Sequence, residues 1–305
     1  MKPKLLILTL TLAALTLALY LWAAGKSSPN HLGAPALQLT QEILTHGPRP
    51  PASPALTAVK NHLATQLHTA GWHTTLQEFE RTTPIGLVKF SNLRARIPLP
   101  GQPTWDRPIK GILCAHIDSK YFPQKKFLGA DDAASACAAL ITIATHLSTH
   151  LPEQAHQLEI VLFDGEEAFQ ENMTLLDGLY GSRHYANTLR TSPDKPKFGI
   201  LLDMVGHKNL SIAIPSDSPE KLAQLMFAAA AKIGASSRFR TAPGPILDDH
   251  LPLNLIGIPT IDIIGDFANS PWWHTPGDNS TLISADSLDT SIRVTLHMLG
   301  ELLGK

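Results

Sequence analysis

The stretch Leu158-Glu159-Ile160-Val161-Leu162-Phe163-Asp164-Gly165-Glu166-Glu167 decides the fold, because an apolar run ends there in a cluster of acids. A run of this length that is almost wholly apolar is typical of a strand buried on both faces of a sheet. Two more runs share this form: residues 112–115 lead into His116-Ile117-Asp118, and residues 199–202 lead into Asp203. The carboxyl ends of strands form the ligand site in open α/β sheets, so we expect these polar side chains to meet at one edge.

The rest of the chain alternates between strand patterns and helical patterns. Strands are predicted at residues 72–79, 88–97, 110–117, 158–163, 198–202 and 259–264. Helices are predicted at residues 37–46, 54–71, 133–146, 183–189, 219–233 and 285–303. This order predicts an α/β fold with a central, twisted, mostly parallel mixed β-sheet that is flanked by helices on both faces.

The composition excludes several classes of protein. Hydrophobic residues make up 44% of the 305 residues and charged residues 17%, which argues against a disordered chain. A chain of this length buries a large core and needs no disulfide framework to fold. The 25 basic residues are matched by 26 acidic ones, so no basic excess indicates a nucleic-acid partner.

The N-terminus has the pattern of a targeting segment. Lys2 and Lys4 precede an apolar run from residue 5 to residue 24, long enough as a helix to span about 30 Å of hydrocarbon. We therefore expect residues 1–25 to form either a membrane anchor or a signal peptide, with Ala23-Ala24-Gly25 as a cleavage site.

The leader also predicts where the rest of the chain resides. The leader lysines favour a cytoplasmic N-terminus. Residues 26–35 then form a tether, and residues 36–305 form a single exported catalytic domain. The predicted location is periplasmic or otherwise extracytoplasmic, with the domain tethered to the inner membrane if the leader is not cleaved.

The polar residues at the strand ends suit a metal ion. Gly129-Ala130-Asp131-Asp132 and Trp273-His274-Thr275 supply further acids and an imidazole, and this donor set is typical of Zn²⁺. The adjacent Glu166 and Glu167 repel each other when buried unless a cation lies between them. One of the pair would bind the metal and the other would act as a general base.

Any one of these residues has an ordinary explanation as well. Most of the 14 histidines are expected to be packed or surface residues, and a single acid after a strand is commonly a helix cap. Five such residues at strand ends together favour a metal site over these separate explanations.

The order of these motifs resembles the zinc aminopeptidase-like (M28-type) clan. Several stretches are more similar to one branch, the animal-type glutaminyl-peptide cyclotransferases or glutaminyl cyclases. These stretches are residues 90–93, 116–122, 163–169, 179–184, 248–252, 273–275 and 278–279. The resemblance covers residues 37–300. Residues 170–173 and 265–271 depart from the animal pattern, which affects the expected shape of the substrate pocket.

The resemblance implies a role for each matching residue. It implies one zinc ion per chain, held by Asp132, Glu167 and His274, with Glu166 as general base. It further implies catalytic roles for Asp203 and Asp248, and substrate contacts for Trp273 and Leu247. His116 and Asp118 would belong to a second metal site or would support the first. Cys114 and Cys137 lie close to the places of a family disulfide, so they are a candidate pair.

The resemblance also implies a reaction, although two alternative functions stay open. The implied enzyme converts the N-terminal glutamine of peptides or proteins to pyroglutamate and releases ammonia, and we expect it to be a monomer. The first rival is a two-zinc aminopeptidase in which Asp132 bridges to a second site at His116 and Asp203. The second is a non-catalytic, membrane-tethered binding module, which the complete set of residues disfavours.

Overall fold

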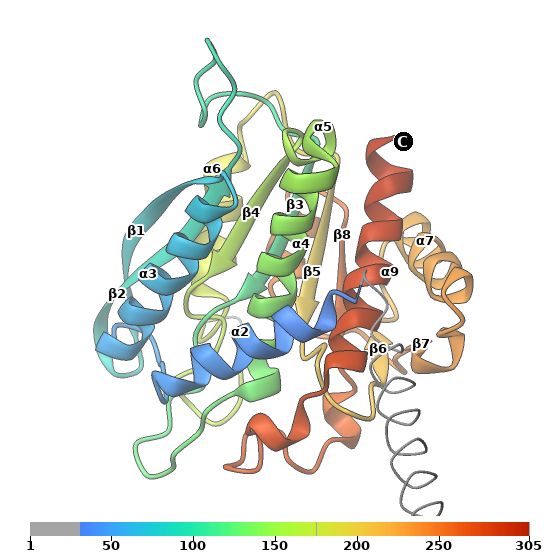
Figure 1. Cartoon of the computed structure of the whole chain (residues 1–305). Coiled ribbons are helices and arrows are strands. Elements are labelled where there is room, and N and C mark those ends of the chain that lie inside the picture. The colour runs from blue at the N-terminus through green and yellow to red at the C-terminus, as the bar shows by residue number, and fades with distance from the viewer. Residues whose placement is uncertain (1–30, 175, 305) are drawn as a thin grey trace, which may run out of the picture. The chain divides into compact units, whose positions relative to one another are not determined.

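A six-stranded sheet forms the centre of the computed structural model, which describes residues 31–174 and 176–304 (Figure 1). Its strand order is β1-β2-β4-β3-β5-β8. The strands are β1 (His73–Thr83), β2 (Gly86–Arg96), β3 (Gly111–His116), β4 (Leu158–Phe163), β5 (Phe198–Asp203) and β8 (Thr260–Ile264). The pairs formed by β4, β3, β5 and β8 are parallel, whereas β1 and β2 are antiparallel, so the predicted mostly parallel mixed sheet is confirmed.

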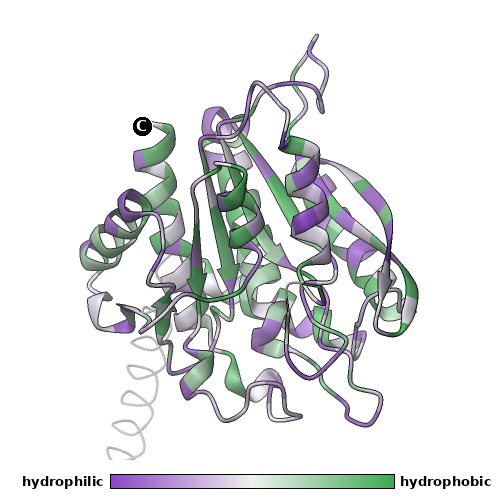
Figure 2. Cartoon of the chain, turned by 180° about the vertical axis from the view of Figure 1, so that it is seen from behind, coloured by the Kyte–Doolittle hydropathy of each residue, from purple (hydrophilic) through white to green (hydrophobic). Residues whose placement is uncertain are grey.

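The register of the central strands brings their carboxyl ends together. Cys114 in β3 pairs with Val161 of β4 on one side and with Leu201 of β5 on the other. All residues of β3, β4 and β5 are buried, as expected for strands covered on both faces. The apolar strands form the green centre of Figure 2. The polar residues that follow these strands therefore share one edge.

Helices cover both faces of the sheet. One face, turned to the viewer in Figure 1, carries α2, α3, α4 and α9. Their bounds are Gly33–Thr45, Pro54–Thr69, Ala136–His150 and Ala285–Leu303. On the other face, α6 (Tyr180–Leu189) and α8 (His250–Leu255) pack Tyr185 and Leu253 against β3, β4 and β5.

Sequence patterns missed the shortest elements. The missed elements include α5 (Pro152–Ala155), α8 and a two-stranded parallel sheet of β6 (Ile212–Ile214) and β7 (Phe239–Thr241). Strands of three residues and helices of four to six give too few positions for a periodic pattern. The predicted helix at residues 219–233 is α7 (Glu220–Lys232), which packs against α9.

Helix α3 illustrates how local sequence fixes an element. The Ser53 side chain accepts a hydrogen bond from the Leu56 N–H and so caps the helix, and Pro54 occupies the first turn. Leu63 and Leu67 lie fully buried on the same face of the helix. Burial of this apolar stripe, more than helix propensity, stabilises the helix.

The N-terminal predictions fall mostly outside the described residues. Residues 1–30 are not described, so the predicted leader at residues 1–25 and its consequences for export and anchoring stay predictions. Helix α2 begins at Gly33, so the last three residues of the predicted tether (26–35) are helical instead. Among the helices of residues 31–174 and 176–304, none is long and apolar enough to cross a membrane.

The candidate disulfide between Cys114 and Cys137 is not formed. The Cys114 thiol packs among the residues that face α6 and α8, and it lies 3.6 Å from the carbonyl oxygen of Ile200. Cys137 lies in α4 on the opposite face, where its thiol donates to the carbonyl of His116. The sheet separates the two sulfur atoms, so the pairing prediction is wrong.

Candidate active site

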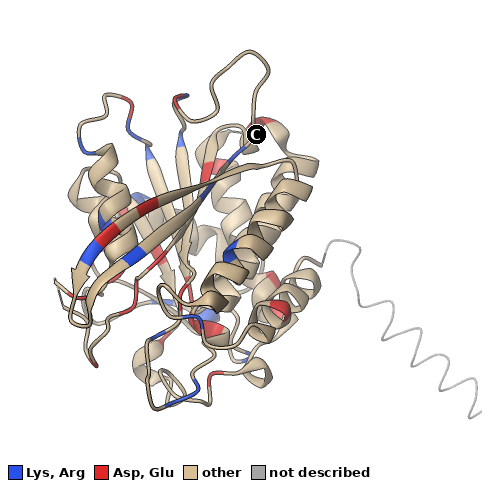
Figure 3. Ribbon diagram, turned by 90° about the vertical axis from the view of Figure 1, so that its left-hand side faces the viewer, with Lys and Arg blue, Asp and Glu red and all other residues tan. Residues whose placement is uncertain are grey.

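Asp132, Glu167 and His274 come together at the carboxyl edge of the sheet, where Figure 3 shows acidic residues gathered below the central strands. Nε2 of His274 lies 3.3 Å from Oδ2 of Asp132 and 3.2 Å from Oε1 of Glu167. Each carboxylate is 3% exposed. Two buried carboxylates converging on one imidazole nitrogen form a donor set that fits a zinc ion.

The segment that carries Asp132 is held by a second acid. The carboxylate of Asp278 accepts hydrogen bonds from the backbone N–H groups of Asp131, at 2.8 Å, and Asp132, at 3.2 Å. Gly129 precedes them at φ +56°, and a Cβ there would lie 1.9 Å from the carbonyl oxygen of Asp132. The peptide bond between Asp132 and Ala133 is cis. The position of Asp132 therefore depends on a glycine and on an acid from the far end of the chain.

Asp118 holds the loop that carries the paired glutamates. Its Oδ1 accepts from the N–H groups of Gly165, at 2.9 Å, and Glu166, at 3.2 Å, and its Oδ2 accepts from Glu167 at 3.3 Å. Gly165 lies at φ +76°, where a Cβ would meet the ring of Phe90 at 2.4 Å. A carboxylate that accepts three backbone hydrogen bonds fixes both glutamates relative to β3.

The backbone of His274 adopts a left-handed conformation that is rare for residues other than glycine, with φ +54°. Its ring stacks on Trp273 with 3.9 Å between centroids, and Phe122 and Phe127 meet it edge-on. Such strain persists where the surroundings fix the conformation, as they commonly do at functional sites.

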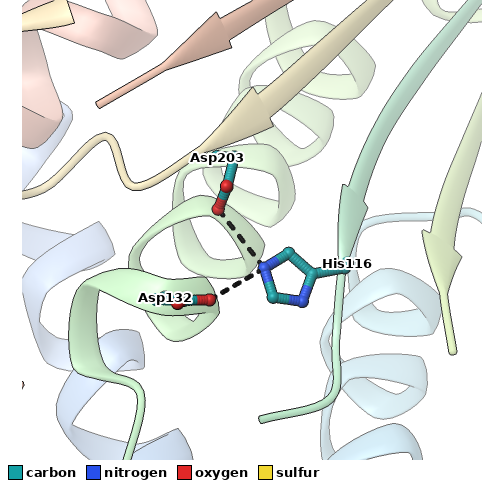
Figure 4. Close-up of side chains that lie close together, drawn as sticks. All are labelled: His116, Asp132 and Asp203. Atoms are coloured by element: carbon teal, nitrogen blue, oxygen red, sulfur yellow. Dashed lines mark hydrogen bonds and ion pairs between the residues drawn. The ribbon is translucent and has the colours of Figure 1, made fainter. Parts of the chain in front are cut away.

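A second cluster adjoins the first and shares Asp132. Nε2 of His116 lies 3.1 Å from Oδ1 of Asp132 and 3.3 Å from Oδ1 of Asp203, as Figure 4 shows. On the other side of the ring, Nδ1 lies 3.7 Å from Asp118 and 3.9 Å from Glu166. Both predicted companions, His116 and Asp118, thus border the site. Asp203 is held in this cluster by its contact with His116.

The electrostatics of the site are dominated by buried acids. Burial raises the pKa of Glu166 well above its usual range, an effect that His116 partly offsets. Burial likewise raises the pKa of Asp203 to about 7. Burial alone would lower the pKa of His274, but Glu167 and Asp132 raise it to about 9. The edge therefore gathers buried acids that resist ionisation, and a divalent ion placed among them would stabilise their charged forms.

Two further buried acids lie next to Asp248. Asp249 and Asp262 are buried beside it, and burial raises the pKa of each well above its usual range. Nδ1 of His250 lies 3.5 Å from Oδ2 of Asp262. Asp262 lies within β8, where one acid in an apolar run gave no signal of a role.

Sequence reasoning also missed two buried cations. Lys120 is 3% exposed, and its Nζ lies 3.4 Å from Oε2 of Glu167 and 3.1 Å from the carbonyl of Ala168. Arg49 is fully buried and donates to the carbonyls of Ile117 and Gly129. Arg49 lies between Pro48 and Pro50, in a segment where no sequence pattern indicated a role.

A cavity of about 270 Å³ opens onto these residues. Glu166, Asp203 and Asp248 line it together with the three candidate ligands. Trp273 and Leu247, both predicted to contact substrate, lie in its wall, and Trp273 is 37% exposed. Asn172 and Met173 occupy the stretch that departs from the animal pattern. Apolar residues such as Trp273 and Leu247 therefore line one part of the cavity, and a group of acidic residues lines another.

Comparison with known proteins places this site in a family. The model of the family described as "Peptidase family M28" matches residues 92–299, which include all three candidate ligands. The chain belongs to peptidase family M28.

Similar proteins include glutaminyl cyclases and a zinc-dependent exopeptidase. The glutaminyl-peptide cyclotransferase-like protein of Bos taurus is 30% identical over 84% of this chain and 72% of its own length. A glutaminyl cyclase structure from an Acidobacteriales bacterium matches with a TM-score of 0.78 and 27% identity, over 90% of this chain and 96% of that one. A Zn-dependent exopeptidase from Parabacteroides distasonis matches with a TM-score of 0.77 and 25% identity, over 92% and 100%.

Proposed function

We propose that this chain is a zinc-dependent glutaminyl-peptide cyclotransferase, which converts the N-terminal glutamine of a peptide or protein to pyroglutamate and releases ammonia. One observation carries the proposal. Glu166 lines the cavity next to the three-residue donor set but is not part of it. A buried acid that is free beside a metal site is suited to move protons. The cyclotransferases among the chain's relatives point to the substrate.

Asp132, Glu167 and His274 would hold one zinc ion. The fit rests on their chemistry, since two carboxylates and one imidazole nitrogen leave a fourth position open for substrate. When bound, the ion would polarise the γ-carbonyl of the glutamine and stabilise negative charge on its oxygen. Lys120, at 3.4 Å from Glu167, keeps that carboxylate oriented toward His274.

Glu166 would transfer the proton. The substrate's α-amine attacks its own side-chain amide, so a bond forms between the α-nitrogen and the γ-carbonyl carbon, and the bond from that carbon to the amide nitrogen breaks. Glu166 accepts the proton that the α-nitrogen loses and donates it to the amide nitrogen, which leaves as ammonia. The same carboxyl group thus returns to its starting state.

The remaining residues would bind and orient the substrate. Asp248 is 3% exposed and lines the cavity beside Glu166, where it can accept a hydrogen bond from the α-amine. Trp273 and Leu247 give the folded glutamine an apolar wall. Holding the amine against the amide supplies effective molarity, which is a large part of the rate enhancement in an intramolecular reaction.

A two-metal aminopeptidase is the second candidate. The cluster of His116, Asp132 and Asp203 is the observation that favours it, because Asp132 could bridge two ions. The exopeptidase from Parabacteroides distasonis has the same fold. That reaction requires a water molecule positioned between two metals and breaks the peptide bond, so it leaves a different product.

Incubation of the zinc-loaded protein with a glutamine-initiated peptide separates the two candidates. Cyclisation gives a peptide of unchanged sequence length that has lost one ammonia, which mass spectrometry detects. Hydrolysis gives free glutamine and a peptide shortened by one residue. A peptide with N-terminal alanine serves as control, because it has no side-chain amide to cyclise. Release of alanine would favour the aminopeptidase.

A further inference from the structure

The cavity of about 270 Å³ that Glu166 lines is called the inner or reaction cavity below. A second cavity of about 530 Å³, the outer cavity, adjoins it. Glu171, Asn172, Trp273 and His274 line both, so the two spaces share one wall. The inner cavity has about half the volume of the outer one. A peptide whose first residue is folded against Glu166 must continue outward, and this neighbouring space lies directly beside that position.

Aromatic side chains form the lining of the outer cavity. We call the surface formed by Tyr121, Phe122, Phe169 and Trp273 the aromatic groove. The rings of Tyr121 and Phe169 lie 5.8 Å apart, and the ring of Phe122 lies 6.0 Å from that of His274. Tyr121 and Phe122 follow the His116-Ile117-Asp118 motif after two intervening residues, so one segment contributes to both the site and the groove.

Buried contacts fix the position of Phe169 in the aromatic groove. Phe169 is 9% exposed and belongs to a buried cluster with Phe90 and Tyr180. Asp177 accepts from the N–H of Phe169 at 3.0 Å and from the hydroxyl of Tyr180 at 2.9 Å. A surface whose rings are already fixed loses little side-chain entropy when a ligand packs on it.

The charges of the groove do not select a charged ligand. Lys125 lies with its Nζ 4.2 Å from the centre of the Phe122 ring, and Glu171 lines the same cavity with the opposite charge. Both side chains are exposed, so solvent screens them. The selective feature is therefore the aromatic surface, which pairs well with another ring.

We propose that the aromatic groove binds the side chain of the second residue of the peptide and selects substrates in which that residue is aromatic. This inference rests on the proposed function, because it requires the first residue to occupy the reaction cavity. Tyr121 acts as a specificity-determining residue, and its ring packs beside that of Phe169 in the groove.

Two amidated peptides test the selection, Gln-Phe-Ala and Gln-Gly-Ala. We expect kcat/KM to be about tenfold higher for the phenylalanine peptide, a difference typical of one well-packed ring. The variant Tyr121→Ala lowers this ratio about threefold or more, whereas Tyr121→Phe keeps it, because the ring and not the hydroxyl provides the contact. Leu87→Ala, at an exposed leucine of β2, leaves the ratio unchanged.

A binding measurement keeps the two hypotheses apart. Calorimetry of the zinc-loaded protein with pyroglutamyl-Phe-Ala and pyroglutamyl-Gly-Ala amides is expected to show tighter binding of the first. If both glutamine peptides are cyclised at equal kcat/KM and both products bind equally, the groove is overturned while the proposed function stands. If neither peptide is cyclised, the proposed function fails, and equal product binding would overturn the groove as well. The comparison uses the unaltered protein, so it does not depend on the folding of a variant.

Discussion

Oδ1 of Asp118 accepts a hydrogen bond from the backbone N–H of Glu166 at 3.2 Å. The same carboxylate also accepts from Gly165 and Glu167. One side chain that follows β3 therefore sets the position of the candidate proton carrier and of a candidate zinc ligand at once. A small shift of the loop would therefore misplace both glutamates together.

Asp118→Asn should lower kcat/KM about 10- to 100-fold, the usual cost of removing a carboxylate that orients metal ligands. The asparagine oxygen can still accept from Gly165 and Glu166, but its NH₂ group would face the N–H of Glu167. Steady-state kinetics together with zinc content per chain measure the effect. Asp217→Asn, at an exposed position, is the matched control. An unchanged kcat/KM would show that the loop holds its position without Asp118.

Glu166→Gln should reduce kcat by a factor of about 100 or more, because the amide cannot accept and return a proton. The zinc content should stay that of the unaltered protein, since Glu166 is not among the three candidate ligands. Ammonia release and elemental analysis measure the two quantities on one sample. Glu153→Gln, at an exposed glutamate, serves as control. Loss of zinc along with activity would instead make Glu166 a ligand.

His274→Ala should abolish tight zinc binding and remove the stabilisation that zinc gives. A ligand present at a hundredfold excess over its Kd stabilises the folded state by about 2.7 kcal/mol. Addition of a chelator should therefore lower the Tm of the unaltered protein and leave that of the variant unchanged. His150→Ala, at an exposed histidine, should respond to the chelator as the unaltered protein does. Equal chelator responses of the two variants would contradict the proposed ligand.

The pH profile of kcat/KM should rise between pH 6 and pH 8. The attacking α-amine must be neutral, and its ordinary pKa is about 7.7–8.0. Glu166 must be ionised to accept a proton, and burial raises its pKa, so both groups lose their active form as the pH falls. Initial rates at substrate concentrations well below KM give the profile. A flat profile across this range would contradict attack by the amine.

The sequence predicted the parts of the site that depend on strand ends. Polar side chains were expected to gather at one edge because parallel strands end there, and the resemblance to glutaminyl cyclases implied Asp132, Glu167 and His274 as the ligand set. In the structure, His274 lies within hydrogen-bond range of both carboxylates. The apolar run at residues 158–163 and the helix at residues 285–303 have the predicted bounds. Long periodic or wholly apolar segments carry this information locally.

Features that depend on the path of loops were not predictable in the same way. Asp278 supports Asp132 across 146 residues of sequence, and Lys120 reaches Glu167 across 47. Cys114 and Cys137 lie close to the places of a family disulfide, yet strand alternation points the Cys114 thiol away from the helix that carries Cys137. Such contacts are set by the packing of the whole domain, which no local pattern records.

Titration of the zinc-depleted protein with Zn²⁺, with ammonia release from a glutamine-initiated peptide recorded at each step, tests the central claim most directly. We expect activity to rise linearly and to level off at one zinc ion per chain, with the product peptide intact. A plateau at two ions with free glutamine as product would contradict the claim and identify the chain as a two-metal aminopeptidase.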